Sequence, residues 1–394
     1  MSAAPGAKTL RAGFAGAGFA ARFHFDSLAG IPGARPAGVW SARAESRERF
    51  AKERSIAAYA SLAALLENVD AVHVCLPPAL HEAVTVAALK KGVHAIVEKP
   101  FTGAFGPAGE TGFRGDTAPK EPMREAAMAS ARRMLEAEAA GKARIFYAEN
   151  WVFAPVVQKE IEIISKTKAQ ILRMIAEESH SGSAAPAYGT WRLSGGGSIV
   201  GKGAHPLTAV LYLKRIEGMV RTGTPIRPAT VTARVHEITR LPGYEDKGHL
   251  RTDYTDVEDC SVVHLVFEDG TVADVFSSEL VMGGVASWLE VFANNHRTRC
   301  NINPVDGLET YNPVDEQFRD VYVVEKIGTK QGWSKPAPDE GWMNGYVQEL
   351  AEFYRCMAED RPSFSGGELG YDTVSVIYSA YLSAERKGVE VEVP

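Results

Sequence analysis

The chain has 394 residues, 45% of them hydrophobic, and its 43 basic and 49 acidic side chains leave a net charge of −6. This length favours two domains, and the composition is typical of a soluble globular protein. The acidic balance and the absence of a Lys/Arg run argue against nucleic-acid and anionic-membrane partners. No apolar stretch is long enough to span a bilayer and residues 1–9 lack a signal-peptide core, so we expect a cytoplasmic protein. The four cysteines are far apart without C-x-x-C spacing, so we expect neither a disulfide framework nor a metal site.

The first motif is a glycine-rich turn, G-x-G-x-x-A, which follows the apolar run 10–15. Gly16 permits the tight turn, and Gly18 has no side chain that would hold a pyrophosphate away from backbone N–H groups. Ala21 allows the next helix to lie close to the strand, and the N-terminus of that helix attracts phosphates. The pattern predicts dinucleotide binding, with Gly16, Gly18, Phe19 and Ala20 in contact with the cofactor.

Strand-like and helix-like segments then alternate, which predicts a parallel sheet wound by helices. The predicted strands are 10–15, 37–41, 71–76, 93–97 and 143–149, and the predicted helices are 43–53, 61–67, 81–91 and 124–141.

Loops at the carboxyl ends of these strands border the ligand crevice of such a sheet. An acidic residue after the second strand would bind the ribose of NAD, but here Ser41 is followed by Arg43, which can accept the 2′-phosphate of NADP. We expect NAD and leave NADP open. Further predicted cofactor contacts follow the later strands, and these are Leu76, Pro77, His81, Glu98 and Lys99. His81 can equally be an ordinary helix-start residue.

Several motifs in order give a family resemblance: GAGFAARFH, CLPPALH and GVHAIVEKPF, then GGGSIVGKGAHPL and SVIYSAYLSAERKGVEVEV. Together they resemble the glucose–fructose oxidoreductase / inositol dehydrogenase (Gfo/Idh/MocA) family. The resemblance implies an α/β protein with a doubly wound Rossmann domain over residues 1–150. It also implies a second α/β domain over residues 151–394, which binds substrate and forms a homo-oligomer through a large, open, mostly antiparallel sheet.

Residues 102–123 depart from that family pattern because they form a Gly/Pro-rich stretch too long for an ordinary connection. This insert is either a disordered surface excursion or a loop that folds over the active-site mouth or reaches a neighbouring subunit. Beyond it, we expect strands at 169–178, 229–238, 261–267, 271–277 and 288–293, helices at 345–357 and 372–386, and a closing strand at 389–393. Asp269-Gly270 predicts a hairpin turn.

The resemblance also locates the chemistry. The family normally carries an Asp four residues before a His, beside the Lys of the Glu-Lys-Pro motif, and this chain has Gly201 at the Asp position, followed by Lys202 and His205. Proton removal from an alcohol needs a group with a pKa near 7, which a His supplies, and which a Lys supplies when burial and a second cation lower its pKa. We therefore expect Lys99 and His205 to handle the proton, with Lys202 as their partner or as an anion ligand.

A segment rich in hydroxyl, aromatic and basic side chains precedes this motif and suits a polyhydroxylated or anionic ligand. The predicted substrate contacts are Asn150, Trp151, His180, Ser181, Ser183, Tyr188, Trp191 and Arg192.

We expect an oxidoreductase that moves hydride between a nicotinamide dinucleotide and a secondary alcohol of a sugar, sugar acid or polyol. The alternative within the same family is an NAD-dependent glycoside hydrolase that oxidises the sugar, eliminates the aglycone, adds water and reduces the ketone with a recycled cofactor. A third possibility is a non-enzymatic regulatory protein that senses the cofactor.

Overall fold

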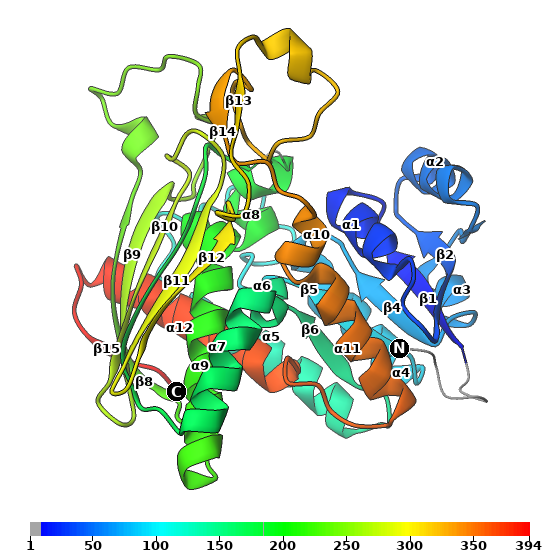
Figure 1. Ribbon diagram of the computed structural model, residues 1–394. Helices are drawn as coiled ribbons and strands as arrows, with labels where there is room; N and C mark the ends of the chain where they lie inside the picture. Colours follow the sequence, from blue (N-terminus) through cyan, green and yellow to red (C-terminus); the bar gives the residue numbers. More distant parts are fainter. Residues whose placement is uncertain (1–8, 184) are drawn as a thin grey trace.

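The computed structural model describes residues 9–183 and 185–394, which form two large β-sheets and one two-stranded sheet, with helices between and around the large sheets (Figure 1). The first sheet is parallel throughout, in the strand order β3-β2-β1-β4-β5-β6. Its strands are β1 (Leu10–Ala15), β2 (Ala34–Trp40), β3 (Ala57–Ala58), β4 (Ala71–Val74), β5 (His94–Glu98) and β6 (Ile145–Ala148). Its helices are α1 (Phe19–Leu28), α2 (Ala44–Arg54), α3 (Leu62–Leu66), α4 (His81–Lys90) and α5 (Lys120–Ala139).

The order of this sheet reverses between β1 and β4, and the loops that leave their carboxyl ends therefore diverge and open a crevice. Strand β4 is buried along its whole length, as expected of a parallel strand covered on both faces. The glycine-rich turn leaves β1 at this crevice. The predicted Rossmann architecture is confirmed.

The second sheet has the order β12-β11-β7-β10-β9-β8-β15. It contains β7 (Ile171–Ser179), β8 (Pro228–His236), β9 (Cys260–Phe267), β10 (Val272–Ser278), β11 (Ala286–Ala293), β12 (Arg297–Asn303) and β15 (Val391–Glu392). Only the β7–β10 pair is parallel within this order, so the predicted open, mostly antiparallel sheet is confirmed. Gly270, with φ of 79°, makes the predicted β9–β10 turn.

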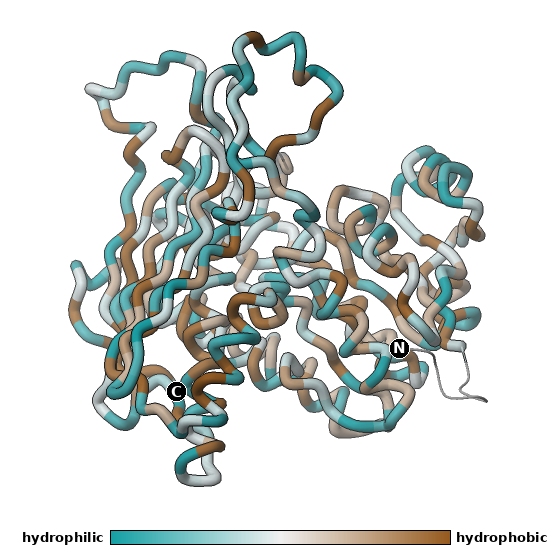
Figure 2. The backbone as a smooth tube through the Cα atoms, viewed as in Figure 1, coloured by the Kyte–Doolittle hydropathy of each residue, from teal (hydrophilic) through white to brown (hydrophobic). Residues whose placement is uncertain are grey.

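Helices α9 (Ala204–Thr222) and α12 (Gly367–Glu385) fill the space between the two sheets: α9 contacts β7, whereas α12 contacts both β8 and α5. Hydrophobic segments gather in the strands and in these inner helices, whereas the outer loops are largely hydrophilic (Figure 2). Smaller helices complete the packing: α6 (Asn150–Phe153), α7 (Pro155–Thr167), α8 (Trp191–Ser194), α10 (Glu340–Met343) and α11 (Tyr346–Ala358). A short hairpin of β13 (Thr310–Asn312) and β14 (Gly332–Ser334) projects at one end.

The insert is folded and packs against α8. Ala104 accepts a hydrogen bond from the indole N–H of Trp191 at 3.0 Å, and Gly115 donates to the Asp256 carboxylate at 2.8 Å. A Cβ at Gly115 would lie 2.0 Å from the Trp191 ring, so this contact requires glycine. The second predicted alternative was a loop that folds over the active-site mouth or reaches a neighbouring subunit. The first part of this alternative is not supported, because no described residue of the insert lines the cavity of the candidate active site.

In the part of the chain that the structure describes, no helix combines the length and the apolar character needed to cross a membrane.

Candidate active site

A cavity of about 330 Å³ lies where the crevice of the first sheet meets the ends of β7, α6 and α9. Both domains predicted from the sequence supply its walls, so a ligand there contacts residues far apart in the chain. Most of its lining side chains are polar or aromatic, and they include Phe19, Ala20, Phe23, Leu76, Pro77, Glu98, Lys99, Asn150, Trp151, Glu178, His180, Ser183, Tyr188, Lys202, His205, Asn303, Asn344 and Tyr346.

The glycine-rich turn fits a dinucleotide. Gly16 has φ of 118°, and a Cβ there would lie 2.2 Å from the carbonyl oxygen of Cys75, so the turn requires glycine. By contrast, a Cβ at Gly18 would meet no atom within 4 Å, which leaves the space beside the N-terminus of α1 open. Phe19 is 59% exposed and lines the cavity together with Ala20. The open N-terminus of α1, a helix of ten residues, is suited to binding a pyrophosphate.

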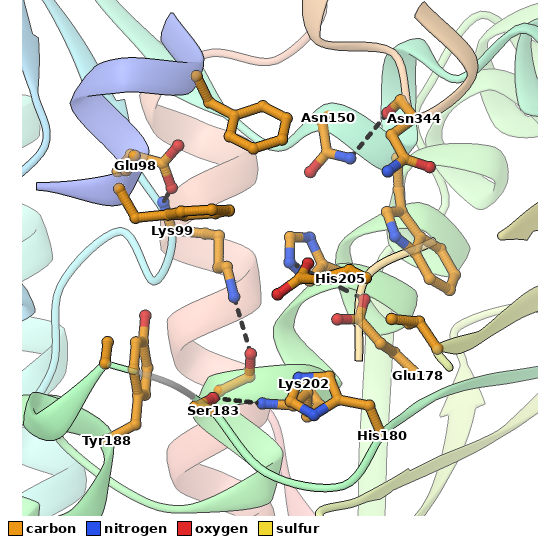
Figure 3. Close-up of a pocket in the computed structure, with 18 of the residues that line it drawn as sticks. Glu98, Lys99, Asn150, Glu178, His180, Ser183, Tyr188, Lys202, His205 and Asn344 are labelled. Atoms are coloured by element: carbon orange, nitrogen blue, oxygen red, sulfur yellow. Dashed lines mark hydrogen bonds and ion pairs between the residues drawn. The ribbon is translucent and has the colours of Figure 1, made fainter. Parts of the chain in front are cut away.

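Lys99 projects from the end of β5 into the cavity, where its ammonium donates a hydrogen bond of 2.7 Å to the carbonyl oxygen of Gly201 (Figure 3). Burial lowers the pKa of Lys99, but the nearby Tyr188 and Glu178 groups, with other carboxylates, outweigh this and leave the pKa above its ordinary value. Lys99 is therefore a fixed positive charge and a hydrogen-bond donor. The expectation that a lowered pKa makes it a base is wrong.

His205 lies in the first turn of α9 and faces the cavity with Nε2, while its Nδ1 is 2.5 Å from Oε1 of Glu149. The Glu149 side chain is fully buried at the start of α6. Burial raises the pKa of Glu149 to about 8 and lowers the pKa of His205 to about 4. The pair consequently shares one proton at neutral pH, and its titration belongs to both residues.

The backbone around Gly201 explains how the chain manages without the family's Asp. Residues Ile199–Gly203 form a single π-helical turn, η3, directly before α9, and such turns are frequent at functional sites. This turn presents the Gly201 carbonyl to Lys99, and Glu149 supplies the carboxylate for His205. In this chain a backbone carbonyl thus accepts from Lys99, and a carboxylate from another element contacts His205.

Lys202 forms a buried ion pair and is not a free cation. Its ammonium donates to Oε1 of Glu279 at 3.0 Å and to Oγ of Ser183 at 2.7 Å, and both charged side chains are 2% exposed. Burial is the main cause that lowers the pKa of Lys202, although Glu279 opposes it. Lys202 therefore fixes Ser183 and the wall of the cavity.

Glu178 is a carboxylate of the cavity wall beside His205. It is 9% exposed, lines the cavity, and has Oε2 3.9 Å from Nε2 of His205. Within residues 9–183 and 185–394 its carboxylate accepts no hydrogen bond, and burial raises its pKa. A buried carboxyl without a donor is costly, so a ligand that brings a hydroxyl or ammonium proton to it gains affinity.

The cavity collects most of the residues that the sequence singled out, among them Lys99, Lys202, His205, Asn150, Trp151, His180, Ser183 and Tyr188. Ser41 and Arg43 lie at the end of β2, where Ser41 accepts a hydrogen bond from Arg47, and they remain predicted cofactor contacts.

Eight predicted site residues do not line the cavity: Gly16, Gly18, Ser41, Arg43, His81, Ser181, Trp191 and Arg192. Of these, His81, Trp191 and Arg192 have other partners. His81 is fully buried, and its ring nitrogens contact the carbonyl oxygens of Leu76 and Pro100, each at 2.9 Å. His81 therefore connects the loop after β4 to the loop after β5. The Trp191 ring is 2% exposed and packs under the insert, and Arg192 donates to the insert carbonyls of Pro107 and Glu110. Ser181 is half-buried and does not line the cavity either.

Among the residues of the site that were not predicted from the sequence are Glu149, Glu178, Asn344 and Tyr346. Glu149 directly follows a strand of the parallel sheet, and that position alone could have identified it. Asn344 and Tyr346 come from the start of α11, a segment with no local pattern that points to a ligand.

Comparison with known proteins agrees with this geometry. Residues 10–110 match the model of an oxidoreductase family with an NAD-binding Rossmann fold, Gfo/Idh/MocA. Over 93 residues the chain is 41% identical to UDP-N-acetylglucosamine 3-dehydrogenase of Acidithiobacillus ferrooxidans, which covers 24% of this chain and 29% of that protein. Over 98 residues it is 40% identical to dTDP-3,4-didehydro-2,6-dideoxy-alpha-D-glucose 3-reductase of Streptomyces violaceoruber, with the same coverage. The chain thus spans less than a third of the length of these curated relatives.

Solved structures share the fold over the whole chain. GenD2 from gentamicin A biosynthesis, in complex with NAD, superimposes with a TM-score of 0.78 at 21% identity, over 98% of this chain and 97% of that one. Myo-inositol 2-dehydrogenase from Lactobacillus plantarum gives 0.72 at 16% identity, over 98% and 100%. The resemblance read from the sequence is therefore confirmed: residues 10–110 match the NAD-binding Rossmann fold of the Gfo/Idh/MocA oxidoreductases, and the solved structures share the fold of the whole chain.

Proposed function

We propose that the protein transfers hydride between a nicotinamide dinucleotide and a secondary alcohol carbon of a sugar, sugar acid or polyol. The observation that carries this proposal is the shared cavity, in which Lys99 and His205 face the same space beside the glycine-rich turn (Figure 3). The two curated relatives, a dehydrogenase and a reductase of nucleotide-linked sugars, support a carbohydrate substrate. NAD is the proposed cofactor, with NADP as the alternative that Arg43 would serve.

A nicotinamide dinucleotide held at Gly16, Gly18, Phe19 and Ala20 would supply the hydride acceptor or donor for the carbinol carbon. The chain's own groups manage the hydroxyl proton. Lys99, as an ammonium, donates a hydrogen bond to the substrate oxygen and stabilises negative charge there. His205 Nε2 removes the proton during oxidation and returns it during reduction, while Glu149 orients the ring through Nδ1. Glu178 accepts a hydrogen bond from a neighbouring substrate hydroxyl.

A substrate panel tests this function. Purified protein is incubated with NAD or NADP and with inositols, aldoses, sugar acids and nucleotide-sugars, and NADH or NADPH formation is followed by absorbance. We expect turnover with at least one of these classes. Aryl glycosides form a separate arm, and phenol release without accumulation of reduced cofactor would replace the dehydrogenase with the recycled-cofactor glycoside hydrolase. No reaction in either arm, with cofactor bound, would favour the regulatory protein.

The shared proton of the Glu149–His205 pair predicts opposite pH profiles for the two directions. Above the Glu149 pKa of about 8 the carboxylate holds the Nδ1 proton and Nε2 is a free base; below it Nε2 carries a proton. We therefore expect kcat/KM for alcohol oxidation to rise with pH through about 8 and kcat/KM for ketone reduction to fall over the same range. Glu149→Gln should move both limbs to lower pH, and an unshifted profile in this variant would contradict the assignment.

We further propose a homo-oligomer built on the outer face of the second sheet, and a cytoplasmic location. The face presents Val262 and Phe276, cross-strand neighbours that are 39% and 37% exposed. Light scattering coupled to gel filtration tests the oligomer, and a monomer in solution would contradict it.

A further inference from the structure

A chain of hydrogen-bonded side chains runs through the first domain, away from the cavity. His24 on α1 places Nε2 2.7 Å from Oε1 of Glu98 at the end of β5. The Nδ1 atoms of His24 and His73 are 2.8 Å apart, and Nε2 of His73 is 2.9 Å from the hydroxyl of Tyr354 on α11. The two histidines are fully buried and Tyr354 is 2% exposed. Four separate elements thus meet in one polar line inside an otherwise apolar core.

With Glu98 ionised and His24 neutral, the chemistry of these groups sets the direction of every hydrogen bond. An ionised Glu98 can only accept, so Nε2 of His24 carries a proton, and Nδ1 of a neutral His24 must accept. His73 therefore donates from Nδ1, and its Nε2 accepts the Tyr354 hydroxyl proton. Burial lowers the pKa of His73 well below its ordinary value, which agrees with a neutral ring that has a single N–H. All three hydrogen bonds point toward Glu98.

Glu98 connects this line to the site. Its second oxygen, Oε2, accepts the backbone N–H of Lys99 at 3.0 Å, and the residue lines the cavity. Burial raises the pKa of Glu98, but the hydrogen bond from His24 and the charge of Lys99 help to outweigh it and hold the pKa below the ordinary value. One carboxylate oxygen is therefore held by His24 and the other holds the Lys99 backbone.

We propose that His24, His73 and Tyr354 are positioning residues that keep Glu98 charged and oriented behind Lys99. The role in turnover rests on the hydride-transfer function proposed above. None of the three lines the cavity, so each acts only through Glu98. The loss of a hydrogen bond to a buried charge is large enough to be measured in the rate.

The test compares two replacements of His24. His24→Leu removes both hydrogen bonds, whereas His24→Gln offers an amide N–H to Glu98 and an amide oxygen to His73. We expect His24→Leu to lower kcat by about tenfold or more while the Kd for NADH changes less than twofold, and His24→Gln to recover most of kcat. Tyr378→Phe is the matched control, because Tyr378 is a buried tyrosine with two hydrogen bonds outside the line; it should lower Tm without changing kcat.

A second readout does not depend on turnover. In protein labelled with ¹⁵N-histidine, the signal of one Nδ1–H tautomer among the ten histidines should disappear in His73→Gln. Tyr354→Phe should shift this signal, and it serves as the variant if His24→Leu does not fold. A folded His24→Leu with the kcat of the unmodified protein, or His73 in the Nε2–H form, would overturn the proposal. An unmodified protein without turnover on any substrate would instead overturn the proposed function and leave the tautomer test standing.

Discussion

Replacing His205 with Asn is expected to lower kcat for alcohol oxidation by about 10²–10⁴-fold, the usual contribution of a general base. Asn keeps a polar side chain of similar size but cannot take up the hydroxyl proton. Because the imidazole also packs against Trp151, with ring centroids 6.1 Å apart, a small loss of Tm is expected as well. The measurement is steady-state kcat and KM for the substrate found in the panel, together with the Kd for NADH.

The control for this variant is His264→Asn. His264 lies on the second sheet and pairs with Asp274 at 2.7 Å, far from the cavity lining. It should retain the kcat of the unmodified protein. If His205→Asn binds NADH and turns over at more than about a tenth of the normal rate, His205 is not the base.

Lys99→Met is expected to lower kcat by about 10²–10³-fold, because it removes a preorganised donor from the oxygen that gains negative charge. The pKa of Lys99 in the unmodified protein lies above the ordinary value, so no change of pH within the working range should reproduce the loss of kcat seen in Lys99→Met. Lys99→Arg keeps the charge but spreads it over a planar fork, and it should be intermediate. We expect kcat and kcat/KM to fall together in Lys99→Met, since the interaction belongs to the transition state.

A different outcome would identify Lys99 as a binding residue only. In that case KM would rise with kcat unchanged. Thermal unfolding distinguishes both outcomes from misfolding: among the described residues the Lys99 ammonium donates one hydrogen bond, to Gly201, so Tm should change little.

The parallel sheet was predictable from sequence because its strands are short, apolar and bounded by recognisable turns. Strand β1 ends at Ala15 and β5 at Glu98, close to the predicted ends. Strand β4 ends two residues earlier than predicted, because the chain leaves the sheet at Cys75 and continues to Pro77. Helix α9 had no amphipathic pattern, since nearly its whole first half is buried between the two sheets. No helix over these residues is therefore predicted from the sequence.

The site was predictable only where residues follow a strand or a motif. Lys99 and His205 were found in this way, and so were their neighbours in the loop after β7. Glu149 and Glu178 were missed as site residues, because a carboxylate gains its role from the partner that the fold brings to it: His205 lies 56 residues from Glu149 in the sequence. Likewise, Trp191 and Arg192 resembled sugar-binding residues, but the insert that covers them has no counterpart in the family pattern.

The two lysines show why charge cannot be assigned from sequence. Proximity of Lys99 and Lys202 suggested that each would lower the pKa of the other. In the fold, carboxylates surround Lys99 and raise its pKa, whereas burial dominates for Lys202 and lowers it. Only Lys202 has a carboxylate within hydrogen-bond distance, and that contact ties it to the cavity wall.

The most direct test of the account is a titration of the purified protein with NADH while tryptophan fluorescence is recorded, since Trp151 lines the cavity. The matched variant is Gly18→Asp: a Cβ there meets nothing, and Asp is a favourable N-cap, but its charge would repel a pyrophosphate. The account predicts saturable quenching for the unmodified protein and none for Gly18→Asp, with equal or higher Tm in the variant. Absence of quenching and of any thermal shift with NAD, NADH, NADP and NADPH in the unmodified protein would contradict it.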